Sequence, residues 1–154
     1  MITETLTRRQ VKEAIDTFFT ATLLQKPVAS EVTDKIVAGL TKDLQPRDYL
    51  IGLADEYGMS NTTAVIKEML NLLPEGNKRP LYVVLSALAY EAEDKVSANQ
   101  YLQKAFEEDM NYPMAKLLIR VYMAEWSSEN MTKMRQELHP QVVENLDDSP
   151  IGYN

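Results

Sequence analysis

Apolar residues recur every three or four positions along most of the 154-residue chain, and strand-like alternation is almost absent. The segment 8–24 has this spacing, and it follows a Thr7–Gln10 pair placed as a capping box. Further amphipathic segments begin behind Ser30 and at Pro46. The pattern predicts an all-α protein, a compact domain of about eight helices joined as antiparallel helix hairpins.

One segment is apolar on every face. The ten residues that begin at Leu81 contain one serine as their only strongly polar member. A helix that is apolar all round is enclosed from several sides, so we expect residues 81–92 to form the central helix. The turn-rich stretch 74–80 in front of it is interpreted as an internal joint. We therefore predict a single domain over residues 1–146.

The last residues, 147–154, contain Pro150 and Gly152 and few apolar side chains. Chain ends of this composition are usually poorly ordered. We predict that this C-terminal tail is mobile and dispensable for folding.

Residues 79–112 follow a 34-residue helical pattern with bulky and small residues at fixed positions, carried by Tyr82, Leu85, Ala98, Leu102 and Ala105. Small alanines allow two antiparallel helices to approach closely. The pattern resembles a tetratricopeptide repeat, which implies a tetratricopeptide-like second half. The departures from it are Ser86, Ala89 and Met110.

In that repeat frame, the first helix turns four residues towards a binding groove. They form an apolar strip with an acidic edge, made of Val83, Ala87, Tyr90 and Glu91. We predict that these residues bind a partner protein through an apolar or basic segment, docked as a helix or an extended peptide.

A second resemblance covers about a third of the chain, residues 73–126. A proline-bearing loop leads to an apolar helix, an alanine-rich helix and a further helix marked by Tyr112, Ala115, Leu117 and Leu118. This order resembles the C-terminal part of the Domain-of-Unknown-Function family numbered 4192. The resemblance implies a helical module of unassigned role, with an origin in high-GC Gram-positive bacteria or their phages and mobile elements, and it supplies no catalytic residues.

The charge of the chain disfavours nucleic acid as a partner. The formal net charge is −7, and residues 81–154 hold 12 acidic and 6 basic side chains. Binding to phosphate backbones requires a basic face. The acidity leaves open another function, in which the chain mimics charge and occludes a basic site on a host protein as an inhibitor or effector.

Candidate chemistry is sparse. The chain has no cysteine and one histidine, His139, which precedes Pro140 beyond the last predicted helix and is interpreted as solvated. The acidic runs 91–94 and 107–109 lack the glycine of a calcium loop. We predict no enzyme activity, no metal site and no cofactor. The chain also has neither a signal-peptide pattern nor a membrane span, so we expect a cytoplasmic protein.

The sequence therefore favours a non-enzymatic protein-interaction or scaffold module. The acidic charge mimic is the first alternative, and binding that weakens uniformly with salt would identify it. A virion or assembly subunit is the second, and its oligomeric state would identify it. Self-association into a homo-oligomer is left open.

Overall fold

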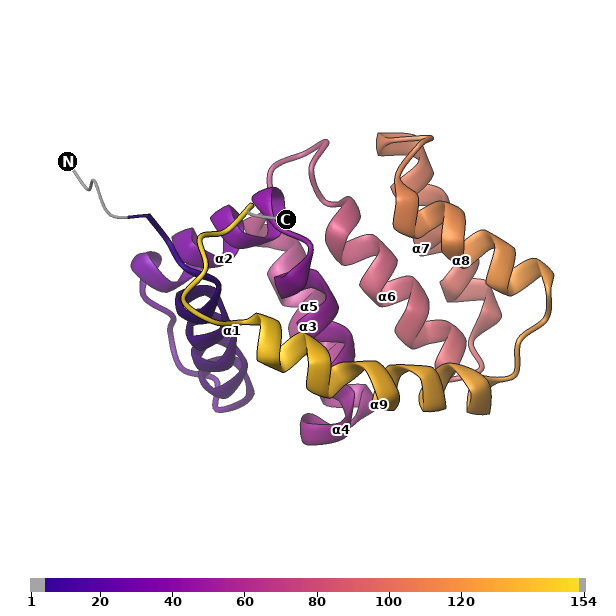
Figure 1. Cartoon of the computed structure of the whole chain (residues 1–154), viewed down its shortest axis with the longest axis horizontal. Helices are drawn as coiled ribbons and strands as arrows, with labels where there is room; N and C mark the ends of the chain where they lie inside the picture. Colours follow the sequence, from indigo (N-terminus) through magenta and orange to yellow (C-terminus); the bar gives the residue numbers. More distant parts are fainter. Residues whose placement is uncertain (1–4, 153–154) are drawn as a thin grey trace.

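The computed structural model describes residues 5–152, and in that range it contains α-helices, one 3-10 turn and no strand beyond an isolated bridge (Figure 1). The all-α prediction is confirmed. The helices are α1 (Arg8–Leu23), α2 (Ser30–Lys42), α3 (Gln45–Gly52), α4 (Ala54–Tyr57), α5 (Met59–Met69), η1 (Leu70–Leu72), α6 (Arg79–Glu91), α7 (Lys95–Glu108), α8 (Pro113–Met123) and α9 (Ser128–Asn145).

Helix α1 begins with the predicted capping box. The Gln10 backbone N–H donates to Thr7 Oγ1 at 3.2 Å, and the Thr7 N–H donates to Gln10 Oε1 at 2.9 Å. These bonds occupy two N–H groups that have no partner within the helix. From this start α1 runs along α2 and buries Val11, Ile15 and Phe19.

Helix α6 is the central helix, as predicted. Most of its side chains are buried, and they face two different hydrophobic clusters. Its contribution to the first cluster, which also includes side chains of α1, α2, α3 and α5, is Leu81, Val84, Leu85 and Leu88. Its contribution to the second cluster, shared with α7, α8 and α9, is Val83, Ala87 and Tyr90. Helix α6 is thus apolar on all sides because it packs against a different cluster on each side.

Helices α6 and α7 form the predicted antiparallel hairpin within residues 79–112. The close approach uses Ala98 and Ala105, which are fully buried. Ser86 Oγ donates to the Ala98 carbonyl at 2.7 Å and lies 2.8 Å from Tyr122 Oη. A buried hydroxyl is therefore satisfied at the position where the repeat pattern has a small residue. Assignment to the tetratricopeptide family stays a prediction.

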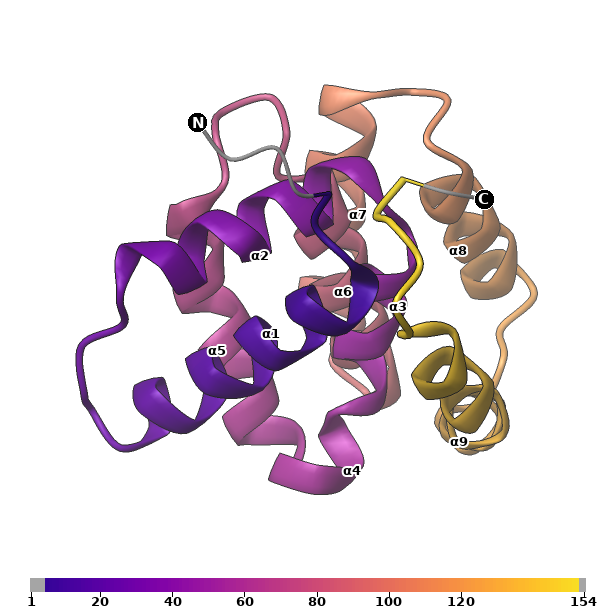
Figure 2. The ribbon, with the colours of Figure 1, turned by 60° about the vertical axis from the view of Figure 1, so that its left-hand side comes forward.

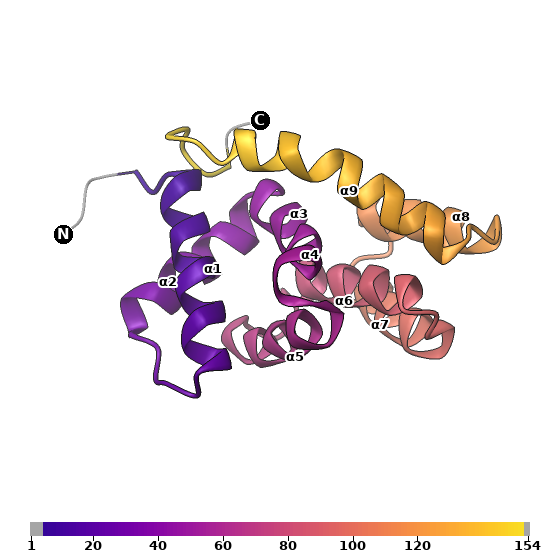
Figure 3. The same ribbon diagram turned by 90° about the horizontal axis from the view of Figure 1, so that it is seen from below.

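Helix α9 is longer than the sequence indicated, because it continues through His139 and Pro140 to Asn145. Proline removes one backbone donor and disfavours a helix interior. Here the helix persists because one of its faces packs against α3 and α6. Figure 3 shows α9 lying along the molecule from the α8 side to the α1 side. The interpretation of His139 as a solvated residue beyond the last helix is wrong.

The segment 147–152, which we call the C-terminal strap, runs past the start of α1 in Figures 1 and 2. The backbone N–H groups of Arg8 and Arg9 donate to the carbonyls of Ser149 and Asp147 at 2.9 and 2.8 Å. Ile151 packs against the first cluster. The strap thus supplies acceptors to the first turn of α1, and the mobility and dispensability predicted for residues 147–154 stay a prediction. Residues 153 and 154 lie outside the described residues.

Candidate docking groove

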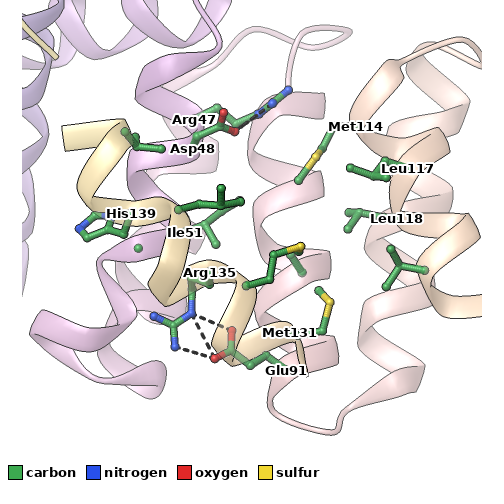
Figure 4. A pocket seen from close by; sticks show the side chains of 16 residues that line it. Arg47, Asp48, Ile51, Glu91, Met114, Leu117, Leu118, Met131, Arg135 and His139 are labelled. Atoms are coloured by element: carbon green, nitrogen blue, oxygen red, sulfur yellow. Dashed lines mark hydrogen bonds and ion pairs between the residues drawn. The ribbon is translucent and has the colours of Figure 1, made fainter. Parts of the chain in front are cut away.

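An apolar hollow of about 320 Å³ lies between α3, α6, α8 and α9 (Figure 4). We call it the α8–α9 groove. Its apolar lining includes three methionines and is made of Ile51, Ala87, Met114, Leu117, Leu118, Val121, Met131, Met134, Leu138 and Val142. Methionine side chains adapt to partners of different shape. The lining therefore suits an apolar occupant.

The groove exists because α8 and α9 diverge from the connection between them (Figure 1). Helix α8 starts at Pro113 and buries Ala115, Leu118 and Val121, whereas α9 packs mainly on α3. The connection is held in place at Trp126, whose carbonyl accepts from Tyr90 Oη at 2.5 Å. The small side chain of Ala87 on α6 leaves the space between the two helices unfilled.

One end of the groove is closed by a buried ion pair. Arg135 Nη2 donates to Glu91 Oε1 at 2.6 Å, and Arg135 Nε donates to Glu91 Oε2 at 2.9 Å. Arg135 Nη1 lies 2.9 Å from Asp55 Oδ2, and Thr132 Oγ1 donates to Glu91 Oε1 at 2.7 Å. The hydrogen bonds to Glu91 raise the pKa of Arg135 above its usual value. Both buried charges are paired with opposite charges of the same chain, although Arg135 Nη1 makes no hydrogen bond of good geometry, so this end offers no unpaired charge to a ligand.

At the other end of the groove, the Arg47 guanidinium also has partners within the chain. Its Nε and Nη2 donate to Asp48 Oδ1 at 3.0 and 2.9 Å, and its Nη1 donates to Tyr112 Oη at 3.1 Å. The guanidinium lies over the Tyr112 ring, 5.9 Å from its centroid. The groove thus has two internally paired charged ends and an apolar middle.

His139 lies on the wall formed by α3 and α9. Its ring stacks on Tyr49, with centroids 5.9 Å apart and planes 15° apart. The ring occupies the space where a Cβ on Gly52 would stand, 1.8 Å from Nδ1. Nδ1 is buried and has no hydrogen-bond partner. Burial lowers the pKa of His139, because the surroundings of the packed ring disfavour the charged imidazolium.

The four residues predicted to bind a partner do share one face of α6, but helices of the same chain cover that face. Val83, Ala87 and Tyr90 are buried in the second cluster. The Tyr90 ring stacks on Tyr122 at 4.3 Å, and the Glu91 side chain is buried in its ion pair. Only Ala87 and Glu91 of the four line the groove. The apolar surface that is exposed in the structure therefore belongs to α8 and α9, whereas the sequence analysis expected it on α6.

The sequence analysis assigned no binding role to the residues at the groove edges, Leu117 and Leu138. A signal was present in α9, where Met131, Met134 and Leu138 follow the spacing of a helical stripe. Pro140 obscures this stripe in the sequence, because a proline usually marks the end of a helix.

No group of three or more histidine or acidic residues within 5–152 could hold a metal ion. Over the same range, no helix combines the length and the apolar character needed to cross a bilayer.

Comparisons with known proteins found no family model, no curated protein and no solved structure that matches the chain. The resemblance to the Domain-of-Unknown-Function family numbered 4192 therefore stays an expectation that rests on the residues quoted for it. The interpretation of the groove rests on its geometry.

Proposed function

We propose that this chain is a non-enzymatic protein-interaction module, and that its docking surface is the α8–α9 groove. The observation that carries the proposal is a pair of leucines at the groove edges above the methionine-lined hollow. Leu117 is 45% exposed and Leu138 is 56% exposed, although both belong to an apolar lining. An apolar patch that faces water next to a hollow is typical of an interaction site.

The groove suits an apolar helical segment of another protein chain. Helix α9 has 18 residues, which at 1.5 Å per residue gives a wall about 27 Å long. A docked helix would place side chains of one face into the hollow, as in other helix-in-groove complexes. The charged groups at both ends already have partners, so burial of apolar area is the main source of affinity. Binding of this kind tolerates salt.

The test is affinity capture from the native cell extract with three immobilised proteins: wild type, Leu138→Glu and Leu24→Glu. Leu24 is an exposed leucine near the end of α1, so its variant controls for a new charge on an exposed apolar residue. We expect a protein that wild type and Leu24→Glu retain in high salt and that Leu138→Glu loses. Circular dichroism verifies that all three are folded.

Equal retention by wild type and Leu138→Glu would overturn the groove as the docking surface. A partner released uniformly by salt would instead favour the acidic charge mimic.

A further inference from the structure

We propose that the occupant of the α8–α9 groove is the same face of a second copy of this chain, so that two copies pair about a two-fold axis. The inference rests on the proposed docking function of the groove and names its partner. It starts from the charged residues beside the two apolar edges.

The two edges of the groove carry charges of opposite sign. On α8, Arg120 lies three residues after Leu117, so it stands on the same outer side of the helix, with Lys116 next to it. On α9, Glu137 lies three residues after Met134, with Lys133 one turn before it and Glu144 two turns further on. The α8 edge is therefore basic, and the α9 edge, with two carboxylates and one lysine, is net acidic.

These five charged side chains are exposed, and none of them is in an ion pair with another of the described residues. By contrast, the charges inside the groove, Glu91 and Arg135, are paired. The edge charges are thus the ones free to meet a partner.

The basic α8 edge is unusual because the half of the chain that contains it is acidic. Residues 81–154 hold 6 basic and 12 acidic side chains, and two of the basic ones stand together on the α8 edge. A purely basic partner would be repelled by this edge, and a purely acidic partner would be repelled by the α9 edge. An occupant that carries both signs can pair with both edges.

A second copy meets this requirement by symmetry. In a two-fold pair, each contact occurs twice, so a surface must complement itself. When α8 of one copy lies along α9 of the other, Arg120 faces Glu137 of the second copy, and the reverse contact forms at the same time. Leu117 of each copy then enters the hollow of the other, next to Leu138. The arrangement covers both exposed leucines and pairs the edge charges.

The test is a charge-exchange experiment measured by sedimentation equilibrium from micromolar to millimolar concentration. We expect wild type to dimerise reversibly. Arg120→Glu and Glu137→Arg alone should each weaken dimerisation at least about tenfold, because each places like charges opposite one another twice. Lys26→Glu, an exposed charge change on the α1–α2 connection, should have no such effect.

Mixing the two weakened variants in equal amounts should restore dimers as mixed pairs. In a mixed pair, Glu at 120 of one copy faces Arg at 137 of the other, and the second contact keeps Arg120 opposite Glu137. Failure of the mixture to associate more strongly than its components would overturn the proposed pairing.

A wild type that stays monomeric throughout would overturn the second copy as occupant. If this monomer still captures another protein in a manner sensitive to Leu138→Glu, the docking function stands and only its partner changes. If it captures none, both proposals fail.

Discussion

At the scale of single residues, the ion pair between Glu91 and Arg135 shows that an acidic residue at the end of a helix can be buried inside the protein. Both side chains are buried, and Asp55 provides a second, more exposed carboxylate for Arg135. Removing one member of a buried pair leaves the other charge without compensation. The buried position of Glu91 therefore favours a structural role, whereas the sequence analysis predicted that it binds a partner.

We expect Glu91→Ala to lower the free energy of unfolding by about 3 kcal/mol, since Arg135 would keep only its contact with Asp55. Urea denaturation followed by circular dichroism gives the value. The double variant Glu91→Ala with Arg135→Met should recover part of the loss, because no unpaired charge then stays buried. Glu13→Ala, at an exposed position of α1, serves as the control. A loss no larger than that of the control would contradict the structural role.

Leu85 and Leu88 test the central position of α6. Both are buried in the first cluster, so truncating either to alanine should cost about 2–5 kcal/mol through lost burial and a residual cavity. Leu117→Ala removes the same atoms from an exposed groove edge and should cost far less. Thermal or urea denaturation compares the three. A loss below about 1 kcal/mol at position 85 or 88 would mean that α6 is not enclosed.

We expect His139 to make the stability of the protein depend on pH near neutrality. Burial lowers its pKa below the ordinary value of 6.5, so the unfolded chain binds this proton more readily than the folded chain. Stability from this residue is complete above about pH 6.5 and decreases as the pH falls from there towards the folded-state pKa. It is the only histidine in the chain, and ordinary carboxylates titrate lower, near pH 4.

The measurement is urea denaturation of wild type and His139→Asn at about pH 7.5 and pH 5.5. Wild type should be less stable at the lower pH, and the variant should lose most of this difference. An unchanged pH dependence in the variant would show that another group is responsible.

At the scale of elements, periodicity predicted those helices whose signal is local. The capping box marked the start of α1, and the all-round apolar character of residues 81–90 marked α6. Two features depended on distant residues and could not be predicted in this way. Helix α9 passes through Pro140 because α3 and α6 support it, and the strap is ordered by the first turn of α1, more than 100 residues away in the chain.

The strap provides the prediction at this scale. Deleting residues 147–154 removes the acceptors for Arg8 and Arg9, the Ile151 N–H bond to the Leu6 carbonyl and the packing of the Ile151 side chain. We expect a loss of about 2–4 kcal/mol, or a decrease in melting temperature of roughly 5–12 °C. Deleting only residues 153 and 154 is the control. A melting temperature unchanged by the longer deletion would restore the interpretation of this segment as a dispensable tail.

At the scale of the whole molecule, the candidate site shows the limit of sequence reasoning more clearly than the fold does. The repeat frame placed Val83, Ala87 and Tyr90 on one face, and the structure agrees. The helices that cover this face are determined by the direction of α8 relative to α7 and by the path of α9 across α3. The spacing of apolar residues within a helix predicts neither. The predicted residues thus share a face that other helices of the chain cover, and their role in binding a partner stays a prediction.

The last prediction concerns the cooperativity of the two hydrophobic clusters. Helix α6 supplies side chains to both, and α9 spans the same division, with Met131 in the second cluster and Val142 against the first. Neither cluster can lose its structure without exposing apolar surface of a helix that the other cluster needs. We therefore expect a single two-state unfolding transition.

Trp126, the only tryptophan, reports on the second cluster through its bond with Tyr90, whereas far-ultraviolet circular dichroism reports on all helices. The two signals should give the same melting temperature at a fixed protein concentration. Leu85→Ala in the first cluster and Leu102→Ala in the second should each lower the melting temperature of both signals equally. The reason is that α6 and α9 belong to both clusters, so weakening one cluster destabilises the other. A fluorescence transition that precedes the dichroism, or that moves only with Leu102→Ala, would mean that α7, α8 and the start of α9 unfold as a separate unit. The groove would then lie at a joint between two independently stable parts, and its width would vary with their relative motion.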